Sequence, residues 1–180
     1  GLSILNPDGQ IRHLLREERL PEFIRDPFVW TFLEDEDGSI WIGTVNNGLV
    51  KYRPNDASFT PFRGKVPGSW VKDIAQDEQG KLWFLTNEGL FEYDTKDQQA
   101  QRVDLSGLDN PNTSISLLYP GEDGSLWLGT QQGLVSYHPK GEIKIWDESH
   151  GMADSWVKSI AEDAAGQLWL GTGKGISKFI

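Results

Sequence analysis

Cysteine is absent from all 180 residues of the sequence. Its absence excludes disulfide bonds, thiolate catalysis and cysteine metal sites, but leaves the compartment open, because an exported protein need not contain cysteine. Long apolar runs are missing too, since no stretch approaches the ~20 consecutive apolar residues that span a bilayer. The sequence therefore predicts no membrane segment within this chain.

Positive charge is scarce relative to negative charge. The chain has 17 Lys and Arg against 27 Asp and Glu, a formal net charge of −10. A sequence-independent nucleic-acid binder draws its affinity from basic residues that neutralise phosphates. We therefore expect no nucleic-acid partner. The basic residues near the start alternate with glutamates and are interpreted as a solvated face: Arg12, Arg16, Arg19 and Arg25.

Histidine is rare, and the sequence predicts neither a metal site nor a cofactor. The three histidines fall at unrelated places and do not form a pattern of metal ligands: His13, His138 and His150. Two acidic turns, starting at Asp35 and Gly121, lack the glutamate that a calcium loop of the EF-hand kind needs at its twelfth position. Hairpin chemistry explains these turns better.

Tryptophan and glycine, in contrast, are abundant and recur in a repeat. Eight Trp and 20 Gly suit an all-β protein, in which glycines make tight turns and large rings fill the space between sheets. A pattern of Gly, Leu or Ile, Trp, Thr and a second Gly occurs four times, and its tryptophans are 42 to 44 residues apart: Trp41, Trp83, Trp127 and Trp169. Such a period indicates a repeat architecture.

Each unit contains four short segments with strand composition, separated by turns. The sequence predicts an all-β fold, a β-propeller of four-stranded antiparallel blades with about four blades of ~42 residues. A β-sandwich has a similar strand density, but it would not reproduce one turn-Trp-turn pattern at a nearly fixed interval. One domain covers 1–180, with repeat units near 28–63, 70–104, 114–146 and 156–180 and with residues 1–15 supplying strands to a shared terminal blade.

The chain begins and ends inside a unit, so we expect it to be a piece of a longer protein, with a larger propeller as one option. Its predicted strands number one more than four closed blades require. Three arrangements follow: closure within one chain, a homodimer that joins complementary terminal strands, or an open arc with exposed edges.

The repeated residues have structural reasons. Each Trp is expected to pack between adjacent blades. Each first Gly is expected to take a positive φ in a hairpin turn, and in three units an Asp three residues earlier can accept turn N–H groups.

Val157–Asp163 followed by Gly166–Thr172 resembles the two-component regulator propeller repeat. The resemblance covers nearly the whole chain, with departures at Leu85, where the other units have Gly, and at Gly121, where they have Asp. It implies a sensory role in the periplasmic, extracytoplasmic part of a bacterial inner-membrane signalling protein, with the neighbouring domains of that sensor as partners.

A candidate ligand site lies where the entry to each first strand and the turn between second and third strands share one face. Aromatic rings beside amides and charges suit a carbohydrate or another small molecule. The predicted ligand-binding residues are Phe28, Trp30, Asn46, Asn47, Trp70, Lys72, Gln131, Gln132, Trp156 and Lys158. The turns at 87–88 and 173–174 belong to the same face. The alternative is that Trp70 and Trp156 only plug the blade tops.

The sequence leaves three functions open. The first is a non-catalytic sensory or ligand-binding module, with no catalytic residues. The second is an enzyme similar to the propeller lyases that cleave cyclic peptide antibiotics, of which Leu82–Leu85 is reminiscent, although no histidine paired with a glutamate is visible at equivalent turns. The third is a structural scaffold for protein interactions.

Overall fold

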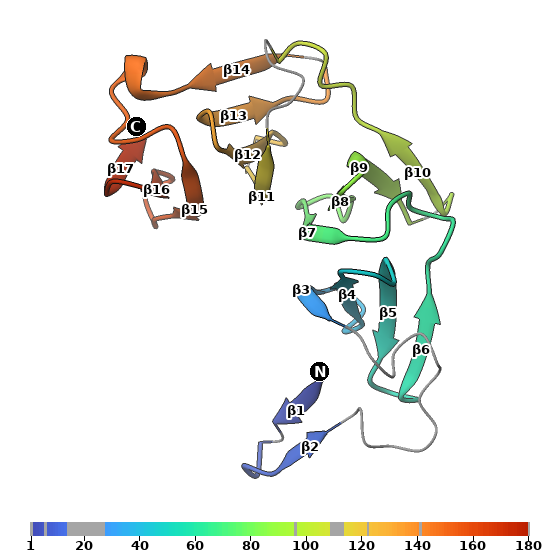
Figure 1. Ribbon diagram of the computed structural model, residues 1–180. Helices are drawn as coiled ribbons and strands as arrows, with labels where there is room; N and C mark the ends of the chain where they lie inside the picture. The colour runs from blue at the N-terminus through green and yellow to red at the C-terminus, as the bar shows by residue number, and fades with distance from the viewer. Residues whose placement is uncertain are drawn as a thin grey trace.

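The computed structural model describes residues 2–5, 7–13, 28–95, 97–108, 114–121, 123–140 and 142–179. Within these ranges the fold is all-β, with antiparallel sheets whose neighbouring strands are also neighbours in sequence. The sheets follow one another as the blades of a propeller, arranged along an arc with the two ends of the chain apart (Figure 1). The predicted fold class is confirmed.

Three sheets have four strands each. The first contains β3 (Val29–Glu34), β4 (Ile40–Thr44), β5 (Leu49–Arg53) and β6 (Ser58–Pro61). The second contains β7 (Val71–Gln76), β8 (Leu82–Thr86), β9 (Gly89–Asp94) and β10 (Gln99–Arg102). The third contains β11 (Ile115–Pro120), β12 (Leu126–Thr130), β13 (Leu134–Tyr137) and β14 (Ile143–Trp146).

Smaller sheets stand at the two ends of the arc. β1 (Ser3–Leu5) and β2 (Ile11–His13) form a sheet of two strands, and β15 (Val157–Glu162), β16 (Leu168–Thr172) and β17 (Ile176–Phe179) form a sheet of three. A single turn of 3₁₀ helix, η2 (Glu148–His150), precedes the latter. Whether the end strands share a terminal blade stays a prediction.

The first strand of each blade lies innermost. β3, β7, β11 and β15 lie beside one another in order, and each second strand contacts the first strand of the next sheet. Each inner strand carries one extra residue that its partner does not oppose, a β-bulge in register between the first and third positions. The four bulged residues are Trp30, Lys72, Ser116 and Lys158.

The repeated tryptophans pack between sheets, as predicted. Trp41 is 1% exposed in a cluster with Val71 and Ile74 of the next sheet, and Trp83 is 1% exposed against Leu118. Trp127 is half-buried and packs with its ring centroid 5.4 Å from that of Phe179 in the last sheet.

Trp169 ends the series at 40% exposure, because among the described residues no further sheet follows it.

The turn aspartates have a role beyond the one predicted. Their carboxylates accept turn N–H groups, and they also accept the indole N–H of the repeat Trp six residues later, at 2.9 Å between Asp35 and Trp41 and at 2.8 Å between Asp163 and Trp169. The Trp169 hydrogen bond holds the pKa of Asp163 below its usual value. The first glycines of the four hairpins have φ of 74° to 78°, which favours glycine.

Leu85 is explained by its neighbour on the inner strand. In the other blades the corresponding residue is glycine, and a Cβ at Gly129 would come within 2.6 Å of Leu117, which lies over it. In the second sheet Leu85 fills this place, and it pairs in register with Asp73. The Asp73 carboxylate instead hydrogen-bonds to both neighbouring inner strands. The departure is therefore one half of a coupled exchange.

Candidate functional site

The entry to each inner strand is held against the turn between the second and third strands of the same blade. Four backbone hydrogen bonds make this connection: Val45 to Phe28 at 2.9 Å, Asn87 to Trp70 at 3.0 Å, Gln131 to Ser114 at 3.3 Å and Gly173 to Trp156 at 3.2 Å. The predicted shared face is confirmed, and we call these residues, with the bulged residues, the entry face.

Each bulged residue lies two positions after an entry residue, and the two side chains form a pair. Lys72 places its Nζ 5.3 Å from the ring centroid of Trp70, and Lys158 does the same at 4.2 Å from Trp156. A cation over an aromatic face is attracted by the ring quadrupole. In the first sheet the pair is two rings, Phe28 and Trp30, stacked at 6.4 Å.

Rings from two blades meet at the first and second sheets. Trp30 makes an edge-to-face contact with Trp70, with 5.4 Å between centroids. Phe28 remains 64% exposed and Trp30 53% exposed. The Trp70 indole nitrogen is covered and has no hydrogen-bond partner within the described ranges. Phe28, Trp30, Trp70 and Lys72 thus form one cluster, which we call the ring cluster.

The other predicted site residues lie on the same face but not in the ring cluster. Asn46 and Asn47 line a cavity of about 400 Å³ between the first two sheets, where Asn47 accepts a hydrogen bond from Arg63 at 2.6 Å. Gln131 and Gln132 are exposed in the turn after β12. Trp156 and Lys158 pair with each other at β15, towards the far end of the arc in Figure 1. The alternative interpretation of Trp156, a plug of the blade top, fits poorly with its 45% exposure.

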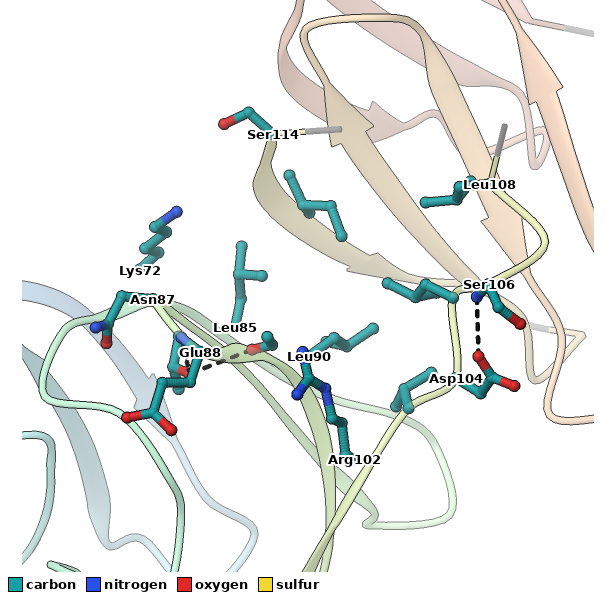
Figure 2. A pocket seen from close by; sticks show the side chains of 15 residues that line it. Lys72, Leu85, Asn87, Glu88, Leu90, Arg102, Asp104, Ser106, Leu108 and Ser114 are labelled. Carbon is teal, nitrogen blue, oxygen red and sulfur yellow. Dashed lines mark hydrogen bonds between the residues drawn. The ribbon is translucent and has the colours of Figure 1, made fainter. Parts of the chain in front are cut away.

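A larger cavity, which the sequence did not reveal, opens between the second and third sheets. Its volume is about 690 Å³, and it lies between the turn at 87–88, the chain after β10 and the start of β11. Figure 2 shows Lys72, Asn87, Glu88, Arg102 and Ser114 around it. Lys72 therefore borders both this cavity and the ring cluster.

No group of three or more His, Asp or Glu side chains within the described ranges is placed to hold a metal ion. His13 contacts Ser3 and His150 contacts Asp147 within its own helical turn. The hydrogen bonds from Ser149 and His150 lower the pKa of Asp147 to about 2.

The central buried carboxylate belongs to Asp73. Burial raises the pKa of its carboxyl above the usual value, and the hydrogen bonds from Leu118, Ile74 and Thr31 offset part of this effect. It contacts three inner strands and so holds the frame on which the entry face stands.

The family described as two component regulator propeller matches three segments of the chain, residues 24–46, 65–88 and 151–174. Each segment runs through an entry residue, an inner strand and the Trp strand, or the start of one. No curated protein matches the chain with significance. Within the described residues, no helix has the length and apolar character needed to cross a membrane.

Solved structures share the fold. The chain is 25% identical, with a TM-score of 0.76, to the extracellular domain of an assigned one component system from B. thetaiotaomicron, over 96% of this chain and 23% of that one. It is 24% identical, with a TM-score of 0.70, to the extracellular domain of an assigned hybrid two component system from the same organism, over 84% of this chain and 21% of that one.

A virginiamycin B lyase from Staphylococcus aureus is 19% identical with a TM-score of 0.72, over 98% of this chain and 61% of the lyase. This likeness shows the fold alone. The chain spans less than a quarter of the length of the two sensor domains that it resembles.

Proposed function

We propose, for a chain that carries two component regulator propeller repeats, that it is a non-catalytic ligand-binding module in the periplasmic part of a bacterial membrane signalling protein. The likeness to extracellular domains of sensor systems supports this assignment. The neighbouring domains of the parent sensor would then be its partners.

The ring cluster is the observation that carries the proposal. Isolated exposed apolar side chains are common on protein surfaces, whereas contiguous exposed rings mark interaction sites. Phe28 and Trp30 offer exposed ring faces, and Lys72 adds a hydrogen-bond donor at the edge of the cluster. A pyranose ring presents a C–H face that stacks on aromatic rings and hydroxyls that bond to polar groups. We therefore propose a carbohydrate as the ligand of the ring cluster.

The test is a thermal-shift screen of the chain against pools of neutral oligosaccharides, followed by titration of any hit while tryptophan fluorescence is recorded. Trp30→Ala should weaken binding at least tenfold, because it removes the exposed ring that bridges two blades. Trp156→Ala is the matched control, because it removes a ring of the same type at the other end of the entry face. Absence of a shift with every pool, or equal effects of both variants, would contradict the ring cluster as the site.

A lyase activity is the second candidate function, favoured by the shared fold with virginiamycin B lyase. Incubation of the chain with quinupristin, followed by chromatography, tests it directly. Conversion of the antibiotic would replace the non-catalytic proposal. A protein-interaction scaffold would instead retain its activity in the parent sensor after the whole ring cluster is replaced.

Association of two copies through their end sheets is a further proposal. Phe32 is 55% exposed at the place where Ile74 is buried in the next sheet, and Trp169 is exposed at the opposite end. The two ends thus show the two halves of the contact that is buried between Trp41 and Ile74. Light scattering should give a doubled mass, and a single-chain mass would contradict it.

A further inference from the structure

One position decides how much room is left between neighbouring sheets on the entry face. In the first sheet it is Phe62, whose backbone N–H donates to the Leu49 carbonyl at 2.9 Å. In the second sheet Val103 donates to the Leu90 carbonyl in the same way, also at 2.9 Å. At the end of β14 the same place in the register belongs to Trp146. A small residue therefore stands in the second sheet where its neighbours carry large rings.

The spaces beside these residues differ accordingly. The cavity beside Phe62 has about 400 Å³, whereas the one beside Val103 has about 690 Å³. Trp146 fills its own place with ring contacts, at 5.5 Å to Trp127 and 4.9 Å to Phe179. The larger cavity is thus a consequence of valine at 103, and its volume lies within the ~300–1,000 Å³ of small-molecule sites.

The two cavities also differ in their arginines. Arg63 in the smaller cavity is engaged by the Asn47 side chain at 2.6 Å. Arg102 lines the larger cavity with its guanidinium against the backbone of Gly89, where an added Cβ would lie 3.3 Å from Nε. Within the ranges that the structure describes, Arg102 forms neither an ion pair nor a side-chain hydrogen bond. Its five donors are therefore available to a ligand.

Three other charged residues border the cavity. Lys72 is the second cation, and its Nζ lies over the Trp70 ring. Asp104 accepts a hydrogen bond from the Ser106 N–H at 2.9 Å, which turns it into its own loop. Figure 2 shows the Glu88 carboxylate directed away from the Arg102 guanidinium. Neither acid neutralises Arg102.

We infer that this cavity binds a small organic acid with an apolar body. The ligand carboxylate pairs with the Arg102 guanidinium, whose planar fork matches the two oxygens. The apolar body lies among the aliphatic side chains of Leu85, Leu90 and Leu108, which line the cavity. The site is separate from the ring cluster and does not depend on a carbohydrate there.

Phenylacetate and its neutral amide, phenylacetamide, are the probes, titrated into the chain by NMR of backbone amides and by calorimetry. Phenylacetate should shift the amides of Gly89 and Val103 and bind at least tenfold more tightly than phenylacetamide, because only the acid forms a charge-assisted pair. Equal affinities, or no binding of either probe, would overturn the inference. Tighter binding of glucuronate than of phenylacetate would overturn the apolar body.

Two variants locate the site. Arg102→Gln should weaken phenylacetate binding at least tenfold, with Arg63→Gln as the matched control that leaves it unchanged. Val103→Phe should abolish binding while the chain stays folded by circular dichroism, because phenylalanine already occupies this place at Phe62. Unchanged binding in Val103→Phe would overturn the site. Trp30→Ala should leave phenylacetate binding intact, which separates this result from the carbohydrate proposal.

Discussion

The carboxylate of Asp73 in β7 accepts a hydrogen bond from the backbone N–H of Leu118 in β11, with 2.8 Å between Oδ2 and N. Its other oxygen accepts from the Thr31 hydroxyl in β3 at 3.3 Å and from its own neighbour Ile74 at 2.9 Å. One side chain thus joins three consecutive inner strands, and it does so from the blade whose second strand carries leucine in place of glycine.

Asp73→Asn should destabilise the chain by about 1–3 kcal/mol, because an amide offers one acceptor oxygen where the carboxylate offers two and leaves one N–H without a partner. Urea unfolding followed by tryptophan fluorescence measures the loss. Thr31→Val is the comparison, since it removes only the longest of these bonds and should cost about 1 kcal/mol or less. An Asp73→Asn variant as stable as the wild type would show that the bridge is dispensable.

Asp73 and Leu85 should behave as a coupled pair. Leu85→Gly empties a place that is 3% exposed and should cost at least about 2–5 kcal/mol. Combined with Asp73→Leu it recreates the pairing of Leu117 with Gly129, so the double variant should lose less than the sum of the single variants, by about 0.5–3 kcal/mol. A double-mutant cycle in urea measures the coupling, and strictly additive losses would refute it.

Trp127 and Trp169 hold equivalent places with different surroundings. Trp127→Ala should cost about 3–5 kcal/mol, because its ring packs against Phe179 and the last sheet. Trp169→Ala should cost well under half of that, since its ring is exposed and keeps mainly the contacts with Asp163 and Lys178. Chemical unfolding of both variants under one set of conditions gives the comparison, and equal losses would remove the role of the following sheet.

The two carboxylates of the inner frame should titrate on opposite sides of 3.8, the ordinary value for aspartate. Burial raises the pKa of Asp73. Burial also acts to raise the pKa of Asp35, but hydrogen bonds from Lys51, Gln76 and Trp41 outweigh it and lower that pKa. Carbon-13 NMR of the side-chain carboxyls should therefore give a pKa above 3.8 for Asp73 and below it for Asp35.

The effects on stability have opposite signs. Asp73 binds its proton more tightly in the folded state, so its contribution to stability falls as the pH rises from 3.8 through its raised pKa. The contribution of Asp35 is present above 3.8 and is lost as the pH falls through its lowered pKa. If the two carboxyls titrate together, the proposed roles of Asp73 and Asp35 in the frame are wrong.

The fold could be predicted from the sequence because every unit repeats the same turns and the same apolar alternation. The strands from Val29 onward lie within a residue or two of their expected bounds, and the entry face follows from the hairpin connections. Local chemistry is enough for both, since turn glycines and strand periodicity act over a few residues.

What could not be predicted depends on contacts between units. The bulge at Trp30 and Lys72 leaves no mark in the sequence beyond the bulky or charged residue itself. The cavity beside Val103 requires the register that equates Val103 with Phe62, and this register is set by pairing across two strands. The spacing of six residues from Asp35 to Trp41 was a usable signal for the indole hydrogen bond, since it recurs at Asp163.

The bulge in each inner strand has a consequence for how such chains diverge. A bulged residue does not take part in the register of the strand ladder, so its side chain can change while the pairing on both sides is kept. Trp30, Lys72, Ser116 and Lys158 already differ in size, charge and polarity although the strand pairing around them is the same. Natural selection can therefore alter what this face recognises by single substitutions at these four places, without a compensating change elsewhere in the propeller.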